Sequence, residues 1–207
     1  MTSRAHEQLE RLTFFSDAVF AIAMTLLVVE VKLPHLEVFG EKELANALLS
    51  LIPDYVGFLV SFLVLGRFWA GHHSLMGLLA ASSPRLVWAN LLMLLAVAFM
   101  PFPTAVVSTY AGLRVGIGFY AGWLLLLGLL NRRLIQVAVA DPALMAPGVD
   151  PVIWHQHLMR TWIPIAIAAS AFVLAMVTPV AGLASLIVGS PLISVVLHRR
   201  AARVRPA

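Results

Sequence analysis

Long apolar segments follow one another along this chain, and no other feature restricts its fold so strongly. Each has close to, or more than, the roughly 20 residues that a helix needs to cross a bilayer. The six segments cover residues 13–33, 45–71, 86–108, 112–136, 153–178 and 181–198. Hydrophobic residues make up 61% of the sequence and charged residues 12%, and a water-soluble fold cannot bury so much apolar surface. We therefore expect an all-α integral membrane protein, with six transmembrane helices in a single domain over residues 1–207.

The distribution of arginine and lysine decides how many times the chain crosses the membrane, because the break at Thr178-Pro179 has the weakest turn signal. Six crossings place both termini on one side, together with eleven of the 14 Lys and Arg residues. The eleven are Arg4, Arg11, Arg67, Arg85, Arg132, Arg133, Arg160, Arg199, Arg200, Arg203 and Arg205, and the other three are Lys32, Lys42 and Arg114. Five crossings would move the four C-terminal arginines to the opposite side. Because cytoplasmic loops carry the excess of positive charge, we expect six crossings and cytoplasmic termini.

Composition also narrows the class of function. Cysteine is absent, which excludes disulfides and thiolate metal sites. The basic run HRRAARVR, residues 198–205, favours contact with anionic lipid headgroups over nucleic acid. The first apolar segment is too long for a signal peptide, so we expect it to remain in the protein. No Ser-His-Asp arrangement and no metal-ligand spacing is evident, and we expect neither an enzyme nor a metal site.

The first segment carries an apolar stripe interrupted by one threonine. At 100° per residue, one set of side chains falls within about 60° of a single line. These are Phe15, Ala18, Ile22, Thr25, Leu26 and Val29. Ser16 and Asp17 point away from that line. The stripe either packs against a neighbouring helix or faces a conduit, and the Thr25 hydroxyl can bond a carbonyl one turn back.

An aspartate within a membrane helix needs partners, since an ionised acid facing lipid is costly. Trp69 and His73 are four residues apart on the second segment and therefore share a helix face, with His72 beside them. Asn90 lies about one turn into the third segment, at the same membrane level. We expect Asp17 to accept hydrogen bonds from the Trp69 indole and from a histidine. Such a cluster either fixes helix packing or takes part in moving protons or ions.

The pattern Arg11-x-x-x-Phe15-Ser16-Asp17, followed by AVFAIAMTLL, resembles the transmembrane protein 175 family of potassium channels, and FWAGHH on the second segment is similar to that family as well. The resemblance covers the six-helix plan and is strongest in the first two helices. Animal members carry two six-helix repeats and form dimers in endolysosomes, whereas bacterial members carry one repeat and form tetramers. The resemblance thus implies a homotetramer in the bacterial plasma (inner) membrane, with helix 1 of each subunit lining a central pore.

The resemblance also implies roles for individual residues. Ile22 forms the narrowest ring, with Leu26 and Val29 further along the pore, and Thr25 contributes to potassium preference. Members of this family lack a carbonyl filter. The remaining motif residues hold the pore helix in place without touching ions. They are Arg11, Phe15, Ser16, Asp17, Trp69, His72, His73 and Asn90.

The expected function is therefore a passive potassium-permeable cation channel of modest selectivity. Its partners are K⁺ and other monovalent cations, the lipid membrane and copies of itself, and it needs no cofactor apart from the permeant ion. The alternative is a proton-coupled transporter that uses Asp17 and His73 as a titrating relay, although no inverted repeat is evident. A scaffold protein without any flux is a third possibility.

Overall fold

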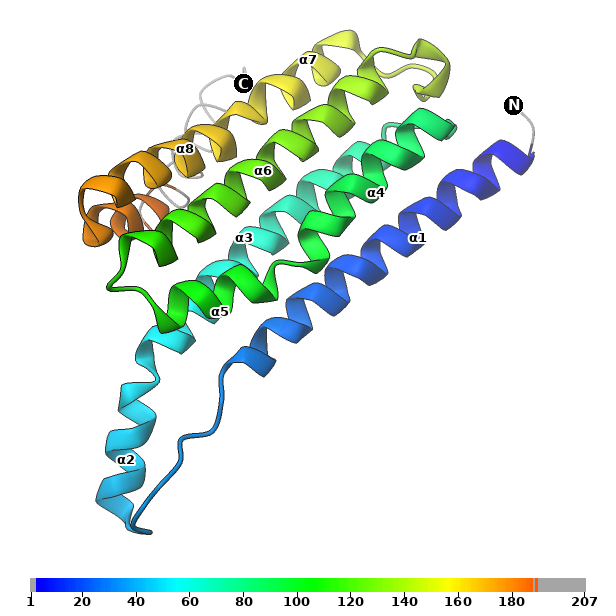
Figure 1. The fold of residues 1–207 in the computed structure, drawn as a ribbon. Helices are drawn as coiled ribbons and strands as arrows, with labels where there is room; N and C mark the ends of the chain where they lie inside the picture. The colour runs from blue at the N-terminus through cyan, green and yellow to red at the C-terminus, as the bar shows by residue number, and fades with distance from the viewer. Residues whose placement is uncertain (1–2, 188, 190–207) are drawn as a thin grey trace, which may run out of the picture.

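The structure, a computed structural model, describes residues 3–187 and residue 189. Its main elements are helices whose long axes run side by side in a bundle (Figure 1). In chain order these are α1 (Ser3–Leu26), the 3₁₀ turn η1 (Leu27–Glu30), α2 (Glu41–Ser50), α3 (Ile52–Met76), α4 (Pro84–Ala98), α5 (Pro101–Thr109), α6 (Arg114–Val139), the 3₁₀ turn η2 (Pro142–Leu144), α7 (Pro151–Arg160) and α8 (Trp162–Val177). Residues 179–187 are helical again. The predicted all-α fold is thus confirmed.

Five stretches of the described chain are long and apolar enough to cross a membrane. They are Ala5–Glu30, Ile52–Met76, Pro84–Thr109, Arg114–Val139 and Pro151–Val177. Each overlaps one of the first five predicted segments. The sixth predicted segment, 181–198, lies for the most part outside the described residues, so the six-helix count stays a prediction.

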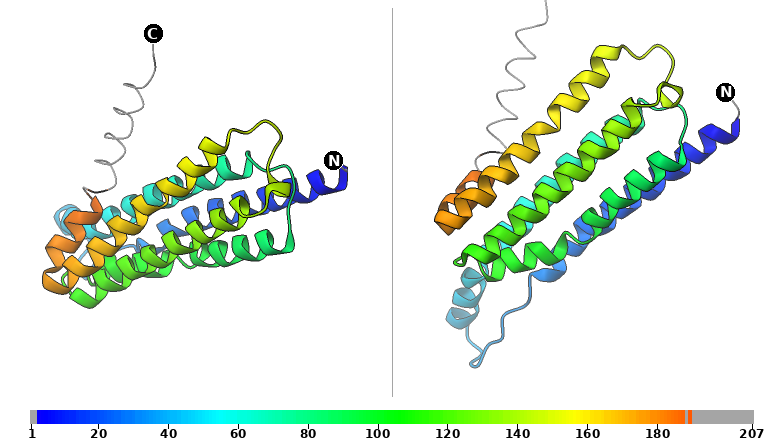
Figure 2. Two further views of the ribbon diagram at one scale, coloured as in Figure 1. Left: turned by 90° about the horizontal axis from the view of Figure 1, so that it is seen from above. Right: turned by 45° about the horizontal axis from the view of Figure 1, so that its top comes forward.

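The second predicted segment, 45–71, has different boundaries in the structure. Its first part belongs to the separate helix α2, and the span runs over Ile52–Met76 instead. Pro53 explains the break, because proline has no N–H to donate to the carbonyl four residues earlier and therefore favours the first turn of a new helix. Figures 1 and 2 show α2 beyond the end of the bundle.

Prolines also interrupt the third span. α4 ends at Ala98 and α5 begins at Pro101. Neither Pro101 nor Pro103 can donate a backbone hydrogen bond, and the carbonyls of Val97 and Phe99 instead accept from residues only three positions later, at 3.1 Å each. The span therefore bends without ending.

One end of the bundle gathers the start of α1 and the α3–α4 and α6–α7 connections, and we call it the α1 end (Figure 1). The two connections are joined by backbone hydrogen bonds, from Ala80 N to Leu144 O at 2.8 Å and from Ala146 N to Leu78 O at 2.9 Å. The described basic residues of the predicted cytoplasmic set occupy the half of the bundle nearer this end, while those of the other set lie near the opposite end. The sidedness in a membrane stays a prediction.

α6 lies at the centre of the packing. It contacts α4, α5 and α8, and Figures 1 and 2 both show α7 and α8 running alongside it. α1, by contrast, is at the edge of the bundle and contacts mainly α3 and α4. One face of α1 is therefore covered by its own subunit and the other is not.

Candidate functional site

The covered and uncovered faces of α1 follow the helical period of its sequence. The covered face consists of Leu9, Leu12, Ser16, Phe20, Ala23 and, in η1, Leu27. The predicted stripe lies on the uncovered side, where Ile22 is 58% exposed, Leu26 45% and Val29 64%. A row of large apolar side chains on one helix face indicates contact with lipid or with another protein surface.

Thr25 interrupts this uncovered stripe with a hydroxyl group. Its Oγ1 donates to the Ile22 carbonyl at 2.9 Å, and the side chain is exposed. That bond uses the single hydroxyl proton but leaves lone pairs on the oxygen. The backbone contact expected from the sequence is therefore present, and it leaves the oxygen able to accept a hydrogen bond or bind a cation.

A buried hydrogen-bonded chain connects the covered face of α1 to α4 and α3. Ser16 Oγ donates to the Leu12 carbonyl at 2.7 Å, so this oxygen can only accept from Asn90 Nδ2, which lies 2.9 Å away. Asn90 then presents Oδ1 to His72 Nε2 at 2.7 Å. The Ser16, Asn90 and His72 residues are all fully buried. The direction of the chain requires the His72 proton to be on Nε2.

A second contact joins α1 to α3 beside this chain. Trp69 Nε1 donates to Asp17 Oδ1 at 2.9 Å, which is the contact expected from the sequence. The prediction that a histidine also donates to Asp17 is wrong for the described residues. His72 bonds Asn90 instead, and the His73 ring packs beside that of Trp69, with the ring centres 5.6 Å apart. The histidines pair differently because only one of them points into the bundle.

The two remaining motif residues, Arg11 and Phe15, lie on the exposed side of α1. Phe15 is 52% exposed, and no ion pair joins Arg11 to Asp17 in the described part of the chain. The sequence motif thus divides into an inner pair, Ser16 and Asp17, and an outer pair. The inner pair bonds to side chains of α3 and α4, whereas the outer pair has no such bond among the described residues.

Sequence reasoning missed a second group of buried polar side chains, Ser61, Thr104 and Tyr120. Ser61 Oγ is 2.9 Å from Tyr120 OH and 2.8 Å from Thr104 Oγ1. The available signal was a hydroxyl residue inside each of three apolar spans. Among residues 3–187 and 189, no three His, Asp or Glu side chains are placed to bind a metal ion together.

Comparison with known proteins gives consistent matches. The family described as endosomal/lysosomal potassium channel TMEM175 matches residues 11–101. A protein of Chamaesiphon minutus that is named a potassium channel is 39% identical over 151 residues, covering 70% of this chain and 74% of that protein. Human TMEM175, named an endosomal/lysosomal proton channel, is 22% identical over 142 residues, covering 68% of this chain and 28% of the human one.

A solved structure agrees over nearly the whole length. It is a lysosomal potassium-selective channel TMEM175 homolog from Chamaesiphon minutus, with a TM-score of 0.81 and 30% identity, and the match covers 91% of this chain and 97% of that one. The level of identity to the bacterial relative and the shared fold lead to one conclusion. This chain belongs to the TMEM175 family.

Proposed function

We propose that the protein is a potassium-permeable channel in which four copies of α1 surround a central pore. The observation that carries this proposal is the uncovered stripe of α1, which combines large apolar side chains with one hydroxyl and is left about half exposed by its own subunit. The names of the bacterial relative and of the matching structure support potassium as the permeant ion. We also propose that this tetramer lies in a bacterial plasma membrane with both termini in the cytoplasm. The distribution of arginine and lysine supports that orientation.

The narrowest part of the proposed pore is a ring of Ile22 side chains, with Leu26 and Val29 further along. Branched apolar side chains around a narrow opening exclude water, and a dry opening blocks ions because they lose their hydration. Conduction therefore requires the ring to widen until K⁺ passes with part of its water shell. In this arrangement the constriction acts as a hydrophobic gate.

Thr25 supplies the polar contact in the proposed pore. Four hydroxyl oxygens at one level replace some of the water around K⁺, and their lone pairs stay available while the protons bond the backbone. A single ring of ligands matches K⁺ less completely than several successive layers of carbonyls do. Modest selectivity follows from this geometry.

The buried contact of Ser16 and the exposed contact of Asp17 are proposed to hold the pore helix in register. Between them they bind α1 to Asn90 on α4 and Trp69 on α3, directly behind the proposed pore face. Arg11 and Phe15 are proposed to contact neighbouring copies, because they lie on the side that the subunit leaves uncovered.

Ion flux into liposomes containing the purified full-length protein tests the proposal. Ile22→Asn should raise K⁺ flux several-fold, because a polar ring stays wet. Val28→Asn is the matched control, since Val28 is 54% exposed but lies roughly 80° from the stripe, because the 3₁₀ turn η1 advances about 120° per residue. Equal K⁺ flux in the wild type and the Ile22 variant would contradict the pore assignment.

The same liposomes distinguish the transporter alternative and proton permeation. A channel passes K⁺ in proportion to the driving force without a proton gradient, whereas a relay of Asp17 and His73 predicts saturable, pH-driven uptake that Asp17→Asn abolishes. A proton-gradient experiment is included because the human relative is named a proton channel.

A further inference from the structure

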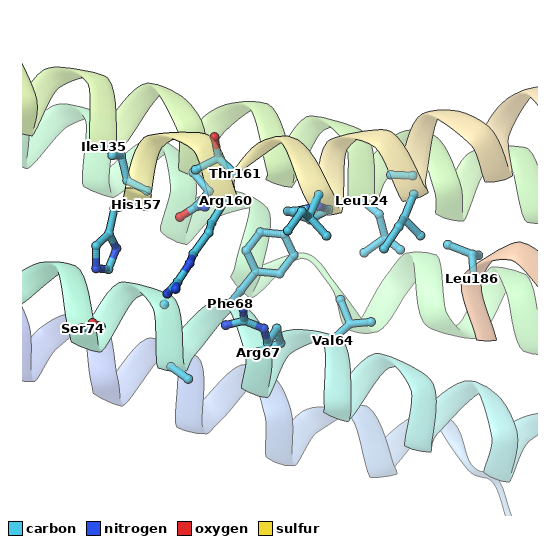
Figure 3. Close-up of a pocket in the computed structure, with 17 residues that line it drawn as sticks. Val64, Arg67, Phe68, Ser74, Leu124, Ile135, His157, Arg160, Thr161 and Leu186 are labelled. Atoms are coloured by element: carbon cyan, nitrogen blue, oxygen red, sulfur yellow. The ribbon is translucent and has the colours of Figure 1, made fainter. Parts of the chain in front are cut away.

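A cavity of about 310 Å³ lies between α3, α6, α7, α8 and the helical residues 179–187, apart from the covered and uncovered faces of α1. The side chains of Arg67, on α3, and Arg160, at the end of α7, both extend into it (Figure 3). Arg67 belongs to the Ile52–Met76 span and Arg160 to the Pro151–Val177 span. Both side chains are exposed in the described subunit. Two arginines within apolar spans at one cavity need an explanation, because cations inside a membrane span are costly unless they meet water or a charged partner.

No acidic residue lines this cavity. Among the described residues, neither Arg67 nor Arg160 takes part in an ion pair or a side-chain hydrogen bond. The neighbouring Arg132 differs, because its Nη1 donates to Leu158 O at 3.0 Å and to Thr161 Oγ1 at 2.8 Å and its guanidinium lies 4.2 Å from the Trp162 ring centre. Arg132 therefore has protein partners, whereas the two cavity arginines are left with donors to offer to a ligand.

The lining changes in character along the cavity. Toward the α1 end it contains Ser74 of α3 and His157 of α7, beside the two arginines. Toward the middle of the bundle it contains Val64, Ile163 and Ile167, together with Leu124 from α6. A ligand that fits this lining has a negative charge at one end and an apolar body at the other.

We propose that this cavity binds a phospholipid with an anionic headgroup, whose phosphate accepts hydrogen bonds from the Arg67 and Arg160 guanidinium groups. Guanidinium groups bind phosphate oxygens through paired N–H donors. The acyl chain lies against the apolar lining toward the middle of the bundle. A lipid fits better than free phosphate, because free phosphate leaves that apolar part of the cavity unused, and basic pockets between membrane helices suit lipid headgroups. The site is independent of the proposed pore.

Native mass spectrometry of the full-length protein tests the proposal, with phosphatidylglycerol titrated against phosphatidylcholine. The wild type should retain phosphatidylglycerol preferentially, and the double variant Arg67→Gln/Arg160→Gln should lose at least ten-fold in affinity for it. Arg133→Gln is the matched control, because Arg133 is exposed on α6 near the same end and does not line the cavity. Equal retention by the wild type and the double variant, or an equal loss in the Arg133 variant, would overturn the proposal.

A second variant keeps both charges and fills the apolar part of the cavity. Ile163→Trp should weaken phosphatidylglycerol binding as well, since it occupies the space assigned to the acyl chain. If inorganic phosphate displaces phosphatidylglycerol and the Ile163 variant still binds that lipid fully, the cavity is a free-anion site and the proposal is overturned. The remaining candidate occupant is the C-terminal part of the chain itself. Because the chain has no cysteine, one cysteine introduced at Gly71 and a second within residues 190–198 test it. Complete disulfide formation there would show that the chain itself fills the cavity, and would also overturn the proposal.

Discussion

At the residue scale, two hydroxyl groups on α1 make the same backbone contact in different surroundings. Ser16 Oγ donates to the carbonyl four residues earlier and also accepts from Asn90 inside the subunit. Thr25 Oγ1 donates to the carbonyl three residues earlier, but the described subunit offers no further partner for its oxygen. The first hydroxyl is therefore committed to helix packing, and the second is free for an ion.

Thr25→Ala should lower the K⁺-to-Na⁺ permeability ratio by about threefold, which corresponds to roughly 0.7 kcal/mol and thus to the loss of one modest polar contact. The ratio is measured from reversal potentials in planar bilayers. Thr13→Ala removes a hydroxyl with a similar backbone bond, to Leu9 O at 3.0 Å, on a different side of the same helix. A drop of the same size in both variants would argue against a specific role for Thr25.

Asn90→Leu should lower the free energy of unfolding by about 2 kcal/mol, because it leaves the buried His72 N–H without an acceptor and removes the hydrogen bond that the Ser16 oxygen accepts. Chemical denaturation in detergent measures the change. Asn131→Leu is the control, since Asn131 is half-buried and makes no side-chain hydrogen bond to any described residue. Similar stabilities for the two variants would show that the buried chain contributes little.

At the element scale, the bend between α4 and α5 is supported from the side. Thr104, on α5, lies within hydrogen-bonding distance of both the Met100 carbonyl, at 2.9 Å, and Ser61 of α3. Ser61 in turn contacts Tyr120 of α6. These buried hydroxyls join three helices at the point where prolines remove backbone hydrogen bonds, and they compensate for part of that loss.

Tyr120→Phe should therefore lower the free energy of unfolding by about 1 kcal/mol, because it removes one partner from a buried hydroxyl group. The thermal unfolding temperature in detergent is the measurement. Tyr110→Phe makes the same chemical change at a side chain that is 52% exposed and is expected to have almost no effect. An unchanged Tyr120 variant would indicate that water or Thr104 replaces the lost contact.

Five of the predicted spans overlap spans of the structure, and the last three of these have nearly the predicted ends, but the first two do not. Hydropathy finds a membrane helix because the bilayer requires about 20 apolar residues. It gives no sign that α1 starts ten residues before its apolar stretch, since polar residues such as Glu7 and Gln8 also form helix readily. The shift of the second span follows from Pro53, whose missing N–H outweighs the apolar residues before it.

The candidate site was predictable to a similar extent. The Asp17–Trp69 contact follows from membrane level and helix face, both of which can be read from the sequence. The partner of His72 depends on the rotation of α3 against α4, which helical spacing within one segment does not determine. The arginine-lined cavity depends on how four separate segments pack, and for that reason single-segment patterns gave no indication of it.

At the scale of the whole molecule, the position of α1 at the edge of the bundle leaves the subunit incomplete. Its uncovered stripe is apolar, and the proposed tetramer turns four such stripes toward one axis. In a cyclic assembly, a residue that lies close to the symmetry axis meets the same residue of the other copies. The assembly is therefore testable with single introduced cysteines in a chain that has none.

Ile22→Cys should form disulfide-linked dimers on oxidation in the membrane, because the same residue of neighbouring copies meets at the constriction. Val28→Cys should not, since Val28 points away from the proposed axis. Gel electrophoresis without reductant measures the linked fraction, and native mass spectrometry of the unlinked protein should show four copies. Linkage at position 28 but not at position 22 would rule out the proposed orientation of α1.

The backbone bonds between the α3–α4 and α6–α7 connections have a consequence for hydrogen–deuterium exchange. Ala80 and Ala146 lie in loops that link helices, where amide protons ordinarily exchange with solvent within seconds. Because each donates to a carbonyl of the other loop, neither proton is released unless the two loops separate. The two amides should thus exchange slowly and with one common protection factor, which would report the free energy needed to separate the two loops.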